Sequence, residues 1–432
     1  MRTSQRIAYL GCSFGLGVFS AFNNFTLTLW LQAGFTSSYL LLALLGNSRS
    51  FEGAIVSPLV GAWSDRTWAG WLGRRRPFIL VGGLLSAALL ALTPTFSAWA
   101  LPSALVPLVG GLAAVVPAIV VIFLFTLTFN VMDDVHKALL ADVTTPDERN
   151  GLSAWAVVVD MAGNVAILAL GFLLWRDRVP TEAFVIAGAL LAVGVLITVV
   201  GVREPSPLQW EAERQEASAP AGSLSPGAFL RLYRGAVVLC LVNLAYWSGL
   251  NAVMPLISVY THDILGATVG QAQLLPGLLL LATTLVAFPA AWLGNRYGKR
   301  LVMSAGFVLI SCAALAALVI TTVEQGVAVF VVAGVGNAGS AVLMVPLLAD
   351  LVPRHHMGVA TGGLAASGSL AAPFATLVAG RLADLYGPRA IFVFMVMMVL
   401  VALVLLPAVQ PAPLQPGKGA HDESAATKAS AL

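Results

Sequence analysis

The sequence LLAD at residues 139–142 occurs a second time at residues 347–350, and in each copy a proline and then a glycine follow it. Upstream of the first copy, GRR at residues 73–75 has a counterpart in GKR at residues 298–300. Both pairs of stretches keep the same order along the chain. Matching stretches in the same order indicate an internal repeat. The chain is therefore predicted to consist of two related halves.

Apolar residues make up most of both halves. The chain of 432 residues is 59% hydrophobic and 10% charged, whereas soluble domains average about 45–50% apolar and about 25% charged residues. A membrane-spanning helix needs about 20 apolar residues, and turn signals divide this sequence into twelve such segments, six in each half. We expect an all-α protein of the cell membrane with two six-helix bundles. The predicted helices lie near residues 7–32, 38–63, 77–95, 106–141, 151–175, 181–202, 235–260, 268–293, 301–321, 326–349, 358–380 and 389–409.

Polar stretches of the sequence mark the limits of the halves. The first half is predicted over residues 1–204 and the second over 235–410, with a linker at 205–234 between them and a tail at 411–432. Lys and Arg favour the cytoplasmic loops of membrane proteins. With both termini in the cytoplasm, as we predict, most of the 23 Lys and Arg residues lie on that side. The exceptions are Arg176, Arg178, Arg381 and Arg389 outside, and Arg49 and Lys137 within the spans.

The sequence also argues against several classes of function. The net charge of +3 is dispersed, so no nucleic-acid partner is expected. Cys12, Cys240 and Cys312 occur singly in apolar segments, which is not the spacing of a disulfide framework or a metal site. The glycine-rich phosphate loop of ATP-driven transporters is absent. We expect no cofactor and no metal. The expected partners are the lipid bilayer, a small-molecule substrate and a coupling ion, and one chain can act as a monomer.

The duplicated halves indicate the class of function. Six-helix halves related by an axis along the membrane normal occur in secondary transporters, which bind substrate near the midplane between the halves. Because ATP is excluded, an ion gradient must supply the energy. A membrane enzyme or a sensor is a weaker alternative, since no Ser, His and Asp set lies within one span and the only long polar connection is the linker.

Two stretches carry a family resemblance. GAWSDR at residues 61–66, followed by GRRRPFI at 73–79, resembles the loop between the second and third helices of the major facilitator superfamily. KALLAD at 137–142 is similar to a pattern of its glycoside/cation symporter branch, which includes the plant-type sucrose/proton symporters. The resemblance implies a sugar symporter. The chain departs from the branch at Thr126, where the family has an acidic residue.

The charged loop after the second helix predicts a cytoplasmic gate. Its basic and acidic side chains can pair with carboxylates at neighbouring helix ends, and such pairs can hold one arrangement of the halves and break in the other. A simple positive-inside anchor is the alternative. The residues of the predicted gate are Asp65, Arg66, Arg74, Arg75, Arg76, Asp142 and Glu148.

Charged residues within the predicted spans need a partner or a function, since an Arg or Asp at the bilayer centre costs about 2.5–3.5 kcal/mol on the insertion scale. Arg49 and Glu52 are three residues apart on one helical face, where they can pair. Lys137 follows Asp133 and Asp134 closely enough to reach either of them. Burial and like-charge repulsion favour the protonated form of the carboxylate that is left over. Asp133 or Asp134 is therefore a candidate proton carrier.

Asp160 extends this charged group to the fifth helix. It is as far from Gly151 as Asp133 is from Asp142, so the two antiparallel helices carry carboxylates to a similar depth of about 13 Å. The alternative is a neutralised network that only fixes helix packing, although the acids outnumber the bases. We predict a cation-coupling site composed of Glu52, Asp133, Asp134, Asp160, Arg49 and Lys137.

The spans of the second half carry neutral polar residues instead of charges. In the seventh helix an aromatic ring can stack on the apolar face of a sugar while amides on either side bind its hydroxyls. Two consecutive amides in the first helix need partners for the same reason as buried charges do. The predicted substrate-binding residues are Asn23, Asn24, Asn243, Tyr246, Trp247, Asn251 and Asn337.

These observations predict a cation-coupled importer of a neutral sugar or glycoside that works by alternating access. The proton is the leading candidate for the cation, and sodium is the alternative, since carboxylates and amides also bind sodium. A proton-driven exporter of amphiphilic compounds is the rival prediction within transport. Against it, residues 157–173 lack the Gly-Pro pair of drug/proton antiporters.

Overall fold

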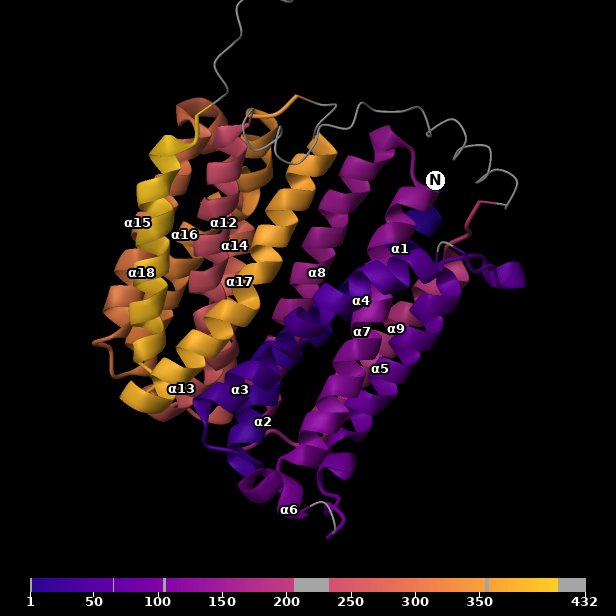
Figure 1. Cartoon of the computed structure of the whole chain (residues 1–432), viewed down its shortest axis with the longest axis vertical. Helices are drawn as coiled ribbons and strands as arrows, with labels where there is room; N and C mark the ends of the chain where they lie inside the picture. Colours follow the sequence, from indigo (N-terminus) through magenta and orange to yellow (C-terminus); the bar gives the residue numbers. More distant parts are fainter. Residues whose placement is uncertain (1, 65, 104–105, 206–232, 354–356, 411–432) are drawn as a thin grey trace, which may run out of the picture.

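A computed structural model describes residues 2–64, 66–103, 106–205, 233–353 and 357–410. Within these residues the chain is helical and contains no strand. The helices form two bundles that lie side by side, one from each half of the chain (Figure 1). The all-α fold with two helical bundles predicted from the sequence is therefore confirmed.

The first bundle is built from residues 3–201. Its longer elements pack in a series, in which α1 contacts α8 and α9, α5 contacts α9 and α7, and α4 contacts α7. Its elements are α1 (Thr3–Ala21), the π-helical segment η1 (Phe22–Thr26), α2 (Leu27–Gly34), α3 (Tyr39–Gly46), α4 (Ser48–Ser64), η2 (Gly70–Leu72), α5 (Arg76–Ser97), α6 (Val106–Val109), η3 (Gly110–Leu112), α7 (Val116–Val143), α8 (Pro146–Leu174) and α9 (Thr181–Gly201).

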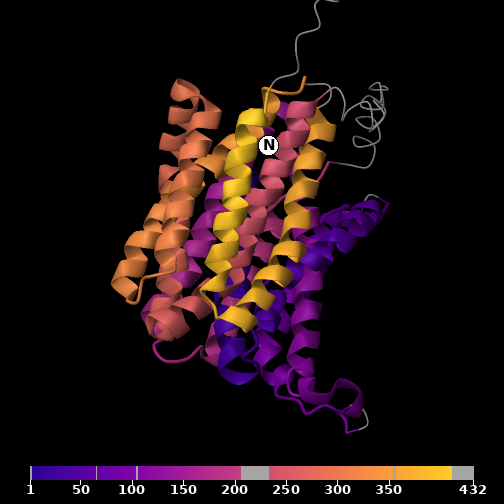
Figure 2. The ribbon, with the colours of Figure 1, turned by 60° about the vertical axis from the view of Figure 1, so that its left-hand side comes forward.

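The second bundle repeats this packing. Here α12 contacts α17 and α18, α16 contacts α14 and α15, and α15 also contacts α18. Figure 2 shows the same helices from the side of this bundle. Its elements are α12 (Arg234–Val253), η4 (Met254–Leu256), α13 (Ile257–Leu265), α14 (Val269–Tyr297), α15 (Lys299–Ala317), α16 (Val323–Ala349), α17 (Met357–Tyr386), α18 (Ala390–Leu405) and η6 (Leu406–Ala408).

Ten helical stretches in the described part of the chain are long and apolar enough to cross a membrane. The remaining two crossing segments are interrupted, which shortens their continuous α-helix. The first runs from α1 through η1 into α2, and the second runs from α3 into α4 across a break at Asn47. Together they make up the predicted set of twelve.

Four predicted helices differ from the observed ones in their start or continuity, and one of them, expected at 235–260, is interrupted by the 3-10 turn η4. The helix expected at 38–63 is broken at Asn47. The backbone of Asn47 leaves the helical conformation there, and its side chain bonds to Thr376 of a neighbouring helix. The helix expected at 106–141 begins only at Val116, because Pro117 at its first positions favours a helix start. The helix expected at 7–32 contains the π-helical segment.

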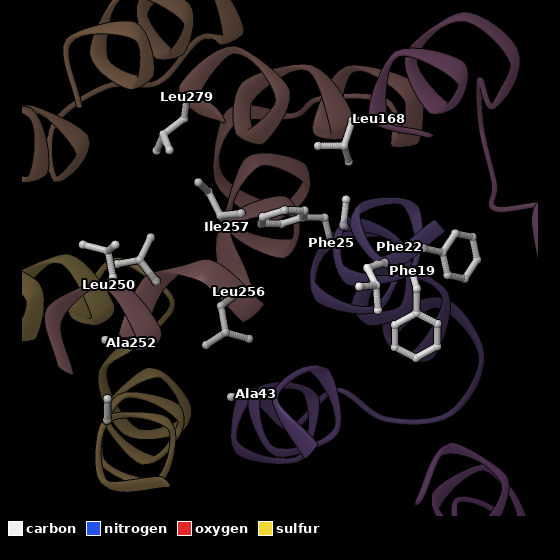
Figure 3. Close-up of a cluster of buried hydrophobic side chains, with 14 of the residues drawn as sticks. Phe19, Phe22, Phe25, Ala43, Leu168, Leu250, Ala252, Leu256, Ile257 and Leu279 are labelled. Atoms are coloured by element: carbon white, nitrogen blue, oxygen red, sulfur yellow. The ribbon is translucent and has the colours of Figure 1, made fainter. Parts of the chain in front are cut away.

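The bundles meet mainly through α3 with α17 and α8 with α14. A cluster of buried apolar side chains fills the space between them, and Figure 3 shows Phe25 of the first bundle facing Ile257 of the second. We call the end of the molecule with the start of α1 and the end of η6 the termini end, and the end with α2, α3 and α13 the far end (Figure 1). The positive-inside pattern predicts that the termini end is cytoplasmic.

Candidate functional site

The predicted amides of the first helix lie in a π-helical segment. Asn23 Nδ2 donates to the backbone oxygen of Gly46 at 2.8 Å, while Asn23 Oδ1 is buried without a hydrogen-bond partner in the described structure. Asn24, in the same segment, is half-buried. Single π-helical turns occur frequently at functional sites because they disturb the regular backbone bonding. The two predicted substrate amides therefore lie in an irregular segment, which the sequence did not predict.

The predicted acidic cluster comes together around α7 and α8. Lys137 Nζ lies 2.9 Å from Asp133 Oδ2, and Asp133 is buried. Asp160 of α8 is close enough to interact electrostatically with Asp133, Arg49 and Lys137. The two antiparallel helices thus bring these carboxylates to one region, as expected. Lys137 bonds to Asp133, and Asp134 beside it is half-buried.

The expected ion pair between Arg49 and Glu52 is not formed, so this prediction was wrong. Arg49 Nη1 donates to Ser20 Oγ of α1 at 2.9 Å, and its guanidinium lies over the Phe129 ring at 5.2 Å. Glu52 Oε1 instead lies 2.6 Å from Thr126 Oγ1 of α7. The two side chains share a helical face but diverge toward different neighbouring helices. The rule that residues three apart can pair applies to the exposed surface of an isolated helix. In this bundle, partners on neighbouring helices compete for both side chains.

Most of the predicted substrate residues of the second bundle bond to one another or to neighbouring helices. Asn243 Nδ2 donates to the backbone oxygen of Leu364 at 3.0 Å and to Ser367 Oγ at 2.9 Å. The Tyr246 hydroxyl donates to Asn337 Oδ1, whose amide donates onward to Thr283. These bonds fix α12 against α14, α16 and α17.

Two of the predicted substrate residues of α12 are less buried than the others. They are Trp247 and Asn251. Trp247 is 42% exposed and packs edge-on against Tyr246. Asn251 Nδ2 donates to the Trp247 backbone oxygen at 2.8 Å, and Asn251 Oδ1 accepts from Asn47 at 3.3 Å. An exposed indole next to an amide can contact a polar ligand with an apolar face.

Asn47, at the break between α3 and α4, joins the two bundles. Its Nδ2 donates to Thr376 Oγ1 of α17 at 2.8 Å as well as to Asn251 of α12, and its Oδ1 accepts from Ser50. Asn47 is not among the site residues predicted from the sequence. An amide in the middle of an apolar helix is the signal that points to it, since such a group needs a buried partner.

A set of hydrogen bonds closes the far end between the bundles. Asp384 of α17 accepts from Ser38 Oγ at 2.9 Å and from the Tyr39 backbone nitrogen at 2.6 Å, at the start of α3. Asp263 of α13 accepts from Gln32 Nε2 at 2.7 Å and from the Tyr39 hydroxyl at 2.9 Å. We call these five residues the far-end latch. Carboxylates at a helix start also benefit from the helix dipole.

Asp384→Asn should loosen the far-end latch. A hydrogen bond to a charged group contributes about 1.5–3 kcal/mol, so the variant should open the far end about 10- to 100-fold more often. The measurement is the rate at which a membrane-impermeant maleimide labels Ala43→Cys, a buried position between the bundles (Figure 3). Asp177→Asn, an exposed acid on a far-end loop, is the matched control. Equal labelling rates in the two variants would show that the latch does not hold this end closed.

The predicted gate residues form ion pairs within the first bundle. Arg74 Nη2 lies 2.6 Å and Arg75 Nε 2.9 Å from Asp142 Oδ2 of α7, and Arg6 pairs with Glu148. Arg66 is exposed, and Asp65 lies outside the described residues. The second bundle has a corresponding pair, with Lys299 Nζ 2.6 Å from Asp350 Oδ2. In each half, one repeated stretch therefore supplies the basic side chain and the other supplies the carboxylate of the same ion pair.

Glu204, which is not among the predicted gate residues, completes the network of the first bundle. Its carboxylate accepts from the backbone nitrogens of Arg74, Arg75 and Arg76 at 2.8–3.1 Å and lies 3.7 Å from Arg76 Nε. Its side chain is 3% exposed. The carboxylate therefore caps the start of α5 from the end of α9.

The sequence matches the model of one protein family, described as the Major Facilitator Superfamily, over residues 9–266 and 239–431. Among curated proteins it is similar to a gentisate transporter of Corynebacterium glutamicum, with 24% identity over 360 residues that span 79% of this chain and 72% of the relative.

Two further relatives are sugar transporters, and the matches are partial. A sucrose transport protein of Arabidopsis thaliana is 27% identical over 200 residues, which span 39% of this chain and 32% of the relative. Proton-associated sugar transporter A of Homo sapiens is 30% identical over 188 residues, which span 40% of this chain and 24% of the relative. This chain therefore matches less than a third of the length of either sugar transporter.

Solved structures share the fold. A D-xylose-proton symporter superimposes with a TM-score of 0.69 at 16% identity, covering 93% of this chain and 96% of the other. A nucleoside transporter superimposes with a TM-score of 0.68 at 13% identity, covering 94% and 99%. Similarity at this level of identity concerns the arrangement of the helices only.

Proposed function

The chain belongs to the Major Facilitator Superfamily, and from this membership we propose that it imports a neutral sugar or glycoside together with a proton by alternating access. It is a multi-pass membrane protein and a secondary transporter, and the relatives named above are transporters. The observation that carries the proposal of ion coupling is the group of buried carboxylates in the first bundle. Glu52 and Asp133 are almost fully buried, and Asp160 lies beside Asp133.

The proposed coupling site consists of Glu52, Asp133, Asp134, Asp160, Arg49 and Lys137, all in the first bundle. A buried acid that changes its protonation state can link the proton gradient to the position of the bundles. Sodium remains the alternative ion, because carboxylates with nearby amides are also suitable ligands for it. We propose cytoplasmic termini, which places the far-end latch on the outer side.

The proposed substrate site lies between the bundles, where this fold binds its substrates. Asn24 in the π-helical segment and Trp247 in α12 are the predicted contacts that remain accessible in the structure. The remaining predicted contacts, Asn23, Asn243, Tyr246, Asn251 and Asn337, are proposed to support them through the bonds described above. The two sugar transporter relatives support a hydroxyl-rich substrate.

A second candidate substrate is an aromatic acid, and Arg49 is the observation that favours it. Among the described residues no carboxylate lies within ion-pair distance of this guanidinium, which bonds to Ser20 and lies over Phe129. Arginine binds carboxylates in a bidentate geometry. The relative from Corynebacterium glutamicum is a gentisate transporter, which supports the same class.

Counterflow exchange in proteoliposomes distinguishes the two substrates. The panel contains radiolabelled disaccharides, hexoses, glycosides and gentisate, each offered to vesicles preloaded with the same unlabelled compound. We expect exchange of at least one sugar and none of gentisate. Exchange of gentisate alone would replace the sugar proposal with the aromatic acid, and efflux of amphiphilic dyes without any exchange would favour an exporter.

A further inference from the structure

Glu52 is a buried carboxyl group with an unusual set of partners. Its side chain is only 4% exposed, Oε1 lies 2.6 Å from Thr126 Oγ1, and Oε2 is buried without a hydrogen-bond partner in the described structure. Burying an ionised carboxylate without a cation is costly, and such groups become neutral instead. The burial of Glu52 therefore favours the protonated form.

Charged groups near Glu52 are bonded elsewhere. On α4 itself, Arg49 donates to Ser20 of α1. On α7, the titratable and charged side chains begin at Asp133, about 10 Å along the helix from Thr126 at 1.5 Å per residue. They are Asp133, Asp134, His136, Lys137 and Asp142. On α17, which also contacts α4, the charged side chains Arg381 and Asp384 lie toward the far end.

The hydroxyl of Thr126 makes this pair suitable for a proton. A threonine hydroxyl has one hydrogen to donate and two lone pairs to accept with. Thr126 Oγ1 has two close acceptors, Glu52 Oε1 at 2.6 Å and the backbone oxygen of Ile122 at 2.8 Å, with the backbone oxygen of Phe123 farther away at 3.2 Å. It can donate to only one of them at a time.

The two possible donations correspond to two protonation states. When Glu52 is ionised, the Thr126 hydroxyl donates to the carboxylate. When a proton binds Glu52, the new carboxyl O–H donates to Thr126 Oγ1, and the threonine hydrogen turns to the Ile122 oxygen. One proton is added and no other covalent bond forms or breaks. The hydrogen bond between Glu52 and Thr126 reverses its direction, and the threonine hydroxyl donates to Ile122 instead.

We propose that the pair of Glu52 and Thr126 is the site that binds and releases the transported proton, with Thr126 as a positioning residue. This assignment rests on the proposed function and makes it more specific. Asp133 then stays ionised in its pair with Lys137, and its role is to hold the charged cluster together. The pair differs from Asp133 in having no cation within ion-pair distance among the described residues.

Infrared difference spectroscopy across a pH titration tests this assignment without a known substrate. The purified protein in lipid should show the carbonyl band of a buried carboxylic acid. We expect the band to be lost in Glu52→Gln and retained in Glu182→Gln, which changes an exposed acid in the first turn of α9. Thr126→Val should shift the band, because the carboxyl O–H loses its acceptor, and Thr126→Ser should restore its position. Glu52→Asp, which keeps the acid, should retain a shifted band if Glu52→Gln does not fold.

Transport assays then separate the two proposals. Glu52→Gln should reduce proton-driven accumulation of the counterflow substrate to a ratio of about one, with exchange within about twofold of the wild type. An unchanged infrared band or unchanged accumulation in Glu52→Gln would overturn the assignment of the proton to this pair. Loss of the band in Glu52→Gln, combined with a wild type that moves no compound of the panel, would support the proton site and reject the proposed function.

Discussion

Glu204→Gln is expected to lower the free energy of unfolding by about 3–5 kcal/mol, the cost of removing one partner from a buried ion pair. The Glu204 carboxylate is 3% exposed and accepts from three consecutive backbone nitrogens at the start of α5. A glutamine amide has a single acceptor oxygen and places an NH2 group against these donors. It also leaves the guanidinium of Arg76 without its carboxylate.

The thermal unfolding midpoint in detergent measures this effect. Glu182→Gln is the matched control, because Glu182 is an exposed acid in the first turn of α9, the same helix that ends near Glu204. A midpoint for Glu204→Gln equal to that of the control would contradict a structural role for the carboxylate. The result also decides whether the chain at the start of α5 is held mainly by Glu204 or by the ion pairs of Arg74 and Arg75 with Asp142.

Gly17→Val should prevent correct packing of α1 against α8, with a loss of stability of about 3 kcal/mol or more, at the upper end of the cost of overpacking. A Cβ atom at Gly17 would overlap the backbone oxygen of Asp160, and one at Gly163 would overlap that of Phe14. The two helices therefore touch through their backbones at two glycines. Small residues permit this close approach in membranes.

Size-exclusion chromatography and the unfolding midpoint provide the measurement for Gly17→Val. The variant also moves Asp160 away from Asp133 and Arg49, so transport should be lost with stability. Gly34→Val is the control, since a Cβ atom at Gly34 meets no atom within 4 Å. A monodisperse Gly17→Val protein with wild-type stability would show that the contact at these glycines is not needed.

The helical fold follows from properties that a sequence displays directly. Apolar length locates most of the spans, and the repeated stretches at residues 73–75 and 298–300 reveal the two halves. The interruptions at Asn47 and within residues 22–26 depend on hydrogen bonds to other helices, and hydropathy carries no information about those. Such breaks are therefore visible in the sequence only as polar residues in apolar segments.

The candidate site was predictable in its residue types and only partly in its partners. Asp133, Asp160 and Lys137 lie together because helical rise sets their depth, which is a property of the chain alone. The direction of each side chain depends on the neighbouring helix. Arg49 and Glu52 diverge for this reason, and Glu204 and Asp384 find backbone partners that lie far away in the sequence.

Proton movement on addition of substrate tests the central claim most directly. Proteoliposomes containing the wild-type protein and an internal pH dye are given the sugar that exchanges in counterflow, with no imposed gradient. Symport predicts acidification of the lumen that depends on the sugar and disappears in Glu52→Gln. Sugar entry with no change of internal pH, in vesicles that hold a pH gradient, would contradict proton coupling.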